Sequence, residues 1–378
     1  MRHEELTEAL ARARDMPDGP GRIAELERII AYADAAADAR LGLDARFELI
    51  AAFNAGAERW RMLAPLGWCR TAFDRDPALF SDADTQRLRR YQRWAVASML
   101  GTCRIGLAQT LATLEDMERR LRSGGHSLRA VFGLRCRIAD HLGDEAAARE
   151  WLGRWRAAPR DEHSDCAGCE ATWQTALLAG WGEWAEAVRA AEPVLQGVLG
   201  CVHQPEAALA AVMVPYLRLG RHEDAGHAHV LAYRRHRQER DGFPFLADHL
   251  RFCALTGHLD RGLDLLAEQL GRLDRPYDDV SAMEFAAAGA LVCRLAAETD
   301  LGGRIVHRPA HRDRPAADLP VAALGIDLLA VAEDLAGRFD ARNGTNHQSG
   351  RVAAWLAVRP VCAPVSLPAA EAEHDPAR

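Results

Sequence analysis

Four short segments of this chain share one turn pattern, and the spacing between them is almost constant. The segments are LGDEAAA at 142–148, WGEWAEA at 181–187, LGRHEDA at 219–225 and TGHLDRG at 256–262. A small residue follows each turn glycine five positions later. The glycines themselves, Gly143, Gly182, Gly220 and Gly257, are 39, 38 and 37 residues apart. A repeat of this length is typical of stacked supersecondary units, so it constrains the fold more than any other feature.

The turn glycine and the small residue each predict a specific local structure. Glycine adopts the left-handed backbone conformation that ends many helices, and a small side chain lets the next helix pack closely against the previous one. Apolar residues follow helical spacing before the third turn, at 209, 212, 213, 216 and 217, and after the fourth, at 263, 266 and 270. Each unit is therefore predicted to be an antiparallel helical hairpin.

This turn pattern resembles the tetratricopeptide repeat, whose usual period is about 34 residues. WGEWAEA matches best because Trp184 is an aromatic residue two positions after the glycine, whereas His222 and Leu259 stand there in later turns. Gly262 also replaces the usual alanine. The resemblance covers about 128–272, and more broadly the chain looks like the degenerate tetratricopeptide-like proteins of high-GC bacteria.

The predicted fold is an all-α, right-handed superhelix of antiparallel helical hairpins, an α-solenoid. A solenoid presents an extended concave groove, so the expected function is non-catalytic binding of a protein or peptide partner. Composition agrees, because 49% of the residues are hydrophobic but only 6% are aromatic, which favours helices over strands. We expect N-terminal hairpins at 1–73, a linker at 74–84, repeats at 85–272, C-terminal helices at 273–357 with an exposed loop at 301–320, and a disordered tail at 358–378.

Charge and hydropathy exclude several partner classes. The net charge of −7 arises from 47 basic and 54 acidic side chains spread along the chain, so no nucleic-acid-binding face is expected. The N-terminus is acidic from Glu4 and does not read as a secretory signal. The longest apolar run, near 286–293, is too short to span a bilayer. We therefore expect a cytoplasmic protein without a membrane partner.

One motif points to metal chemistry. Cys166 and Cys169 form a Cys-x-x-Cys just before a predicted helix, and Cys201 with His203 follows the returning helix. An antiparallel hairpin of matched helices brings both groups to the same end, although more than thirty residues separate them. Zinc favours four sulfur or nitrogen ligands in a tetrahedron. The sequence thus predicts a structural zinc ion that clamps one repeat to the next.

The fourth ligand stays open at this point. His203 lies only two residues from Cys201, so His163 and Asp165 are alternatives, and His229 and His249 are more distant reserves. Reduced loop cysteines, or a disulfide between the first two, are the simpler explanation. A catalytic zinc would instead require an open coordination position, with Glu170 or Glu206 as acid or base. That gives the alternative function, a metal-dependent enzyme or small-ligand sensor.

Two further observations complete the candidate residues. A basic stretch at 225–240 contains Arg234, Arg235 and Arg237, which could bind an acidic partner, although a solvated helix face is the simpler interpretation. The phosphate loops, nucleophile elbow and dinucleotide fingerprint that mark many enzymes are missing from the sequence, which makes catalysis the less favoured function. Six scattered cysteines are expected to be buried reduced thiols: Cys69, Cys103, Cys136, Cys253, Cys293 and Cys362.

Overall fold

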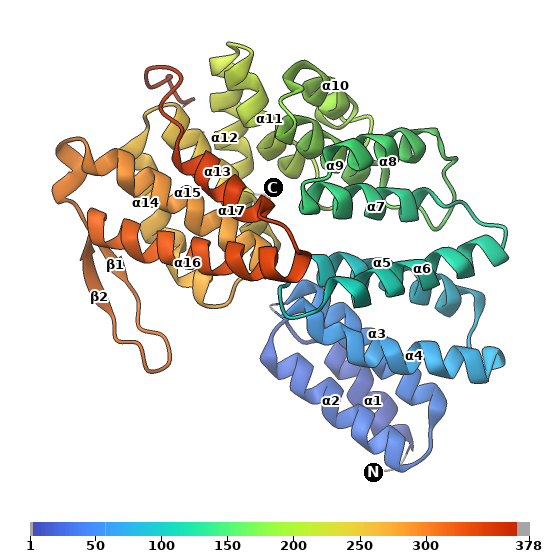
Figure 1. The fold of residues 1–378 in the computed structure, drawn as a ribbon. Helices are drawn as coiled ribbons and strands as arrows, with labels where there is room; N and C mark the ends of the chain where they lie inside the picture. Colours follow the sequence, from blue (N-terminus) through green and yellow to red (C-terminus); the bar gives the residue numbers. More distant parts are fainter. Residues whose placement is uncertain (1–2, 57, 369–378) are drawn as a thin grey trace, which may run out of the picture. The chain divides into compact units, whose positions relative to one another are not determined.

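The computed structural model describes residues 3–56 and 58–368, and in them the chain forms seventeen α-helices and one two-stranded sheet (Figure 1). The prediction of a mostly helical chain is confirmed. The first eight helices are α1 His3–Asp15, α2 Pro20–Ala35, α3 Ala39–Ala55, α4 Leu63–Arg75, α5 Asp82–Leu100, α6 Leu107–Ser123, α7 Arg129–Leu142 and α8 Glu145–Ala157. The remaining elements are α9 Ala167–Gly180, α10 Trp184–Leu195, α11 Glu206–Arg218, α12 His222–His236, α13 Leu246–Leu255, α14 Leu259–Gln269, α15 Asp279–Ala297, β1 Ile305–Arg308, β2 Ala317–Pro320, α16 Val321–Asn343 and α17 His347–Leu356.

The chain divides into two compact units, each with its own core. Unit 1 comprises Met1–Ile138, Arg149–Ser164 and Arg275–Asp279, and unit 2 comprises Ala139–Ala148, Asp165–Asp274 and Val280–Arg378. The region 85–272, expected to hold the repeats, therefore contributes to both units.

Unit 1 is built from consecutive helices that pack on one another from α1 to α6. The segment 74–84, expected to be a linker, contains the end of α4, a short 3-10 helix at Pro77–Leu79 and the start of α5. Phe80 is only 8% exposed and packs edge-on against Phe47 and Phe73, so the connection belongs to the core. Ser81 and Asp84 form a capping box that starts α5 at Asp82, three residues earlier than the apolar pattern indicated.

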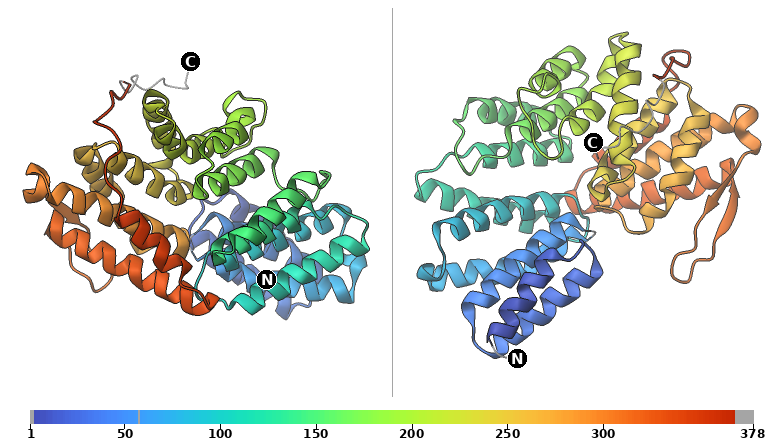
Figure 2. Two further views of the ribbon diagram at one scale, coloured as in Figure 1. Left: turned by 45° about the horizontal axis from the view of Figure 1, so that its top comes forward. Right: turned by 180° about the vertical axis from the view of Figure 1, so that it is seen from behind.

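Unit 2 contains the clearest hairpins. Helix α9 packs on α10, α11 on α12, and α13 on α14, while α11 also contacts α9, α10 and α13 (Figure 2). In each of these three hairpins the two helices therefore pack on each other, and α11 joins the middle hairpin to the one before it and the one after it.

The turn chemistry predicted for the repeats is confirmed. The four turn glycines all adopt left-handed φ angles between 71° and 82°. After the second turn, the N–H of Glu183 donates to the carbonyl of Leu178, which caps the end of α9 as in a Schellman motif. The small residue five positions on is buried in every repeat. At Gly262 a Cβ atom would come within 2.9 Å of Val292, which explains why glycine replaces alanine there. The other three are Ala148, Ala187 and Ala225.

The segment 301–320, predicted to be an exposed loop, contains the only strands among the described residues. Strands β1 and β2 pair in antiparallel register, with Val306 opposite Leu319 (Figure 2). Val306 is 2% exposed whereas Ile305 is 53% exposed, so one face of this ribbon packs on the helices and the other meets solvent. The prolines and alternating charges of this segment obscure its two-residue periodicity.

Helix α15 is the core helix of unit 2. The helix has nineteen residues, and an 18-residue window of it has a mean hydropathy of 1.5, so it is long and apolar enough to span a membrane by length and composition, but 78% of that window is buried in the protein. A Cβ atom at Gly289 would touch Leu266 of α14 and Leu328 of α16, so both helices pack directly against it. High burial of this kind is typical of a core helix.

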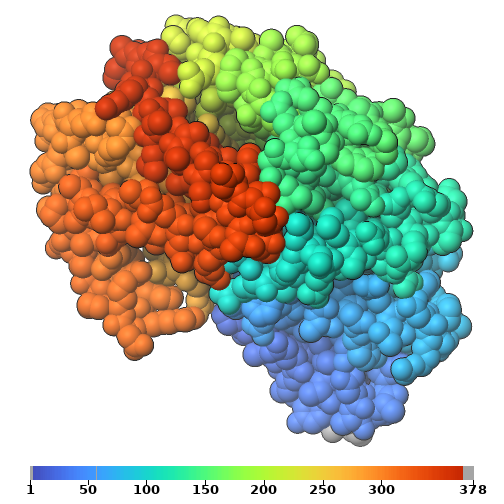
Figure 3. Space-filling model, viewed as in Figure 1, coloured from blue at the N-terminus to red at the C-terminus, as the bar shows by residue number. Residues whose placement is uncertain are grey.

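The segment after α17 is irregular but makes specific contacts. The N–H of Val361 donates to the carbonyl of Leu255, and His258 hydrogen-bonds the carbonyl of Val365. Figure 3 shows α17 and this segment, in red, on the surface next to α16. The part of the expected tail up to residue 368 is thus held against unit 2, and 369–378 lies outside the described residues.

Candidate metal centre

Three of the predicted ligands lie together in unit 2. The sulfur atoms of Cys166, Cys169 and Cys201 are all within 4.8 Å of one another, and those of Cys169 and Cys201 are 3.5 Å apart. Three thiols at these distances could hold a metal ion. Cys166 is the N-cap of α9, Cys169 lies in its first turn, and Cys201 belongs to the loop between α10 and α11.

A glycine between the first two cysteines permits this approach. A Cβ atom on Gly168 would lie 3.2 Å from Cγ of Gln204 and 3.8 Å from the backbone nitrogen of Gly200. The returning loop therefore lies directly on the first turn of α9. The hairpin geometry inferred from the sequence placed both halves of the motif at one end of the helices, and this contact fixes their distance.

The cluster already favours one thiolate. Burial acts to raise the pKa of Cys166, but the backbone N–H groups of Cys169 and Gly168 and the thiol of Cys201 lower it below its ordinary value. N–H groups at a helix start stabilise a thiolate in this way. Burial raises the pKa of Cys169 and of Cys201; the neighbouring thiols raise that of Cys169 further, whereas the Cys169 thiol acts to lower that of Cys201. A bound cation would reverse this, because its charge favours the thiolate at each position.

The proposed fourth ligands are engaged elsewhere. Nδ1 of His203 lies 3.2 Å from a carboxylate oxygen of Asp241, and this hydrogen bond raises the pKa of His203. Its backbone N–H, in contrast, points to the sulfur of Cys201 at 3.5 Å. The carboxylate of Asp165 accepts the N–H of Cys166 at 2.9 Å. His163 belongs to unit 1.

A second group with metal-ligand chemistry lies in unit 1, where His126, Glu162 and His163 converge. The guanidinium of Arg89 fills it: one of its nitrogens is 2.8 Å from Nε2 of His126 and 2.6 Å from Nε2 of His163. Because arginine only donates, both imidazole nitrogens use their lone pairs on it and neither is available to an ion. No local pattern predicts this cluster, because 37 and 74 residues separate Arg89 from the two histidines.

The arginines proposed to bind a partner are partly committed within unit 2. Arg235 pairs with Glu206 at 3.2 Å and with Glu239 at 2.7 Å. Arg237 pairs with Glu268 at 2.8 Å, and Arg234 is exposed. This end of α12 therefore carries ion pairs to other residues of unit 2.

All nine cysteines are free thiols. Four of the six outside the cluster are buried, and burial raises the pKa of Cys253 and of Cys293 to about 12, so these two thiols stay protonated. Cys103 and Cys362 are partly exposed.

Neither a scan of protein-family models nor a search of curated proteins finds a match to this chain. The function has to be inferred from the geometry alone.

Proposed function

We propose that the protein is a non-catalytic, tetratricopeptide-like scaffold that binds a protein or peptide partner, and that Cys166, Cys169 and Cys201 hold a structural zinc ion. One observation carries the metal part. The three thiols come from the start of α9 and from the loop that leads into α11, so one ion would tie two successive hairpins together.

The sulfur distances suit zinc. Zn–S bonds of about 2.3 Å in a tetrahedron place two sulfurs roughly 3.8 Å apart, close to the 3.5 Å between Cys169 and Cys201 and below the 4.8 Å within which all three sulfurs lie. Thiolates are soft ligands that favour zinc over the hard cations magnesium and calcium. The fourth position remains for His203, released from Asp241, or for a solvent molecule.

Support for partner binding comes from the stacking of the hairpins. Helix α11 packs against both α9 and α13, so the first helices of three successive hairpins lie next to one another. In a solenoid these first helices line the groove. Affinity capture followed by chemical cross-linking tests this idea. Cross-links should map to α9, α11 and α13, and a partner linked only to α10, α12 and α14 would contradict it.

Elemental analysis of protein purified without added metal tests the zinc clamp. We expect about one equivalent of zinc per chain, whereas less than about a tenth would sink the proposal. Cys166→Ser should lose the zinc and melt several degrees lower, because its thiol is a ligand of the ion that joins the two hairpins. Cys362→Ser is the matched control, because it removes a partly exposed thiol of unit 2 outside the cluster. It should keep the full zinc content.

A metal-dependent enzyme or small-ligand sensor is the second candidate, favoured by the absence of a fourth protein ligand from the cluster within the described residues. An open position is what a catalytic zinc requires. The acid or base would have to be Glu206, which pairs with Arg235, or Glu170, which is 2% exposed. In that case Cys166→Ser should abolish activity with little change in melting temperature, and X-ray absorption should detect an oxygen ligand from water.

A further inference from the structure

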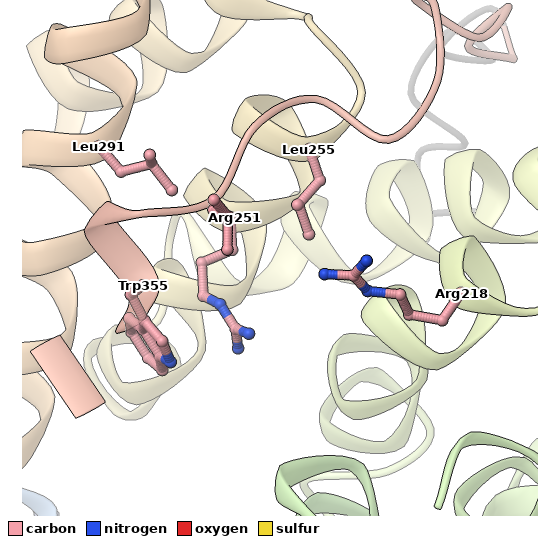
Figure 4. A pocket seen from close by; sticks show the side chains of 6 residues that line it. Arg218, Arg251, Leu255, Leu291 and Trp355 are labelled. Carbon is pink, nitrogen blue, oxygen red and sulfur yellow. The ribbon is translucent and has the colours of Figure 1, made fainter. Parts of the chain in front are cut away.

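A small hollow in unit 2 combines positive charge with an aromatic face (Figure 4). It is shallow and opens to solvent, and its walls come from α11, α13, α15, α17 and the residue at 358. In Figure 4 the side chains of Arg218 and Arg251 reach into the same space from different helices. The lining residues are Arg218, Arg251, Leu255, Leu291, Trp355 and Val358.

The positive charge of the hollow is only partly balanced. Among the described residues no carboxylate lies within ion-pair distance of Arg218. The nearest carboxylate oxygen to Arg251 belongs to Asp248 and is 3.6 Å away, longer than a hydrogen bond. Arg351 is satisfied, since it donates to Glu284 at 2.6 Å. The guanidinium of Arg218 thus has no counter-ion at ion-pair distance among the described residues, and that of Arg251 has only a distant one.

The surroundings of Arg251 disfavour its positive charge. Burial lowers the pKa of Arg251, and the positive charges of Arg351 and Arg218 lower it further, against the opposing effect of Asp248 and Glu284. Burial also raises the pKa of Asp248, which weakens that carboxylate as a counter-ion near neutral pH. An anion between Arg218 and Arg251 would relieve the repulsion that both groups now carry.

The rest of the wall is flat, apolar and held in place. The guanidinium of Arg251 lies 4.2 Å from the ring centre of Trp355, close enough for a cation–π contact that fixes both groups. Arg294 donates to the carbonyl of Val358 at 2.9 Å, and Val361 donates to that of Leu255 at 2.7 Å. Preorganised walls of this kind reduce the ordering that a ligand has to impose.

We propose that this hollow binds a small organic anion, a carboxylate or a phosphate carried on a flat or apolar group. Guanidinium groups bind the oxygens of both anions with paired hydrogen bonds, and Trp355 with Leu255 and Leu291 would cover the apolar part. This binding goes beyond the scaffold function and does not depend on the metal ion.

Calorimetric titration of the full chain with benzoate, phenyl phosphate and the uncharged isostere benzamide tests the proposal. At low salt at least one anion should bind with a dissociation constant below about 10 mM, and the stronger of the two identifies the carboxylate or the phosphate as the preferred group. Benzamide should bind at least about tenfold more weakly, because it lacks the charge.

Two arginine variants locate the binding. Arg218→Gln removes one charge of the hollow from an exposed position, so the fold should survive, and anion affinity should fall at least about tenfold. Arg189→Gln removes the same charge from an exposed site on α10 and should leave affinity unchanged. Failure of both anions to bind, equal losses in both variants, or equal affinity for benzamide would overturn the proposal. So would an acidic peptide that binds far more tightly than either anion with the same dependence on Arg218, since it would assign the hollow to a macromolecule.

Discussion

Three buried histidines form a single directed hydrogen-bond chain in unit 2. Arg261 donates through Nε to Nε2 of His229 at 2.8 Å, so His229 must carry its proton on Nδ1. That proton is donated to Nδ1 of His249 at 3.0 Å, and Nε2 of His249 then donates to Nδ1 of His236 at 3.1 Å. Every imidazole is therefore neutral, with one donor and one acceptor. This arrangement explains why His229 and His249 are not metal ligands in this fold.

These three hydrogen-bonded histidines predict that the protein loses stability in mild acid. Burial, and after it nearby positive charge, lowers the pKa of His229 and His249 well below the ordinary value and that of His236 to about 3. Below about pH 6.5 the unfolded state binds more protons than the folded state, so stability falls with pH from there downward. For each histidine that stays neutral in the folded state, the free energy of unfolding should fall by about 2 kcal/mol between pH 7.5 and pH 5.

Urea unfolding at pH 7.5, 6 and 5 measures this slope for the wild type and for His249→Gln. Glutamine can still donate and accept but does not titrate, so the loss of stability between pH 7.5 and pH 5 should be about 2 kcal/mol smaller than in the wild type. A slope equal to that of the wild type would show that the histidines are not the groups responsible.

At the scale of the helix and its turns, two glycine-to-alanine substitutions should change the stability of the protein in opposite directions. Gly220 has φ of 75°, and a Cβ atom there would meet nothing within 4 Å, so Gly220→Ala isolates the cost of a left-handed backbone. It should destabilise the protein by about 1 kcal/mol. Gly337, inside α16, also has open space around its Cβ position. Gly337→Ala should stabilise by about 0.5–1 kcal/mol because alanine favours the helix. Two changes of the same sign in denaturant unfolding would contradict the turn assignment.

The same scale shows what the sequence could predict and what it could not. The hairpins, their left-handed glycines and the convergence of Cys166 with Cys201 follow from local periodicity, because an antiparallel hairpin brings its ends together whatever else the chain does. The orientation of His203 cannot be predicted in this way, because its ring hydrogen-bonds Asp241, which lies 38 residues later in the sequence. The arginine hollow unites four helices and could not be inferred from any one of them.

At the scale of the whole chain, the division into two units predicts that loss of metal acts on one of them. An ion at the three cysteines would join α9 to the loop before α11, both in unit 2, whereas α2 to α5 belong to unit 1. Binding energy of an ion adds to the stability of the structure that forms its site, so its removal should loosen that structure first.

Amide hydrogen exchange before and after chelation measures the effect element by element. Exchange should become at least about tenfold faster in α9, α10 and the start of α11, because local opening there no longer has to break Zn–S bonds. Protection in α2 to α5 should stay the same and serves as the internal control. Cys166→Ser without chelator should reproduce the pattern, and Cys362→Ser should not. Equal loss of protection in both units would mean that the ion stabilises the chain as a whole, and no change in either would mean that the three thiols hold no structural metal.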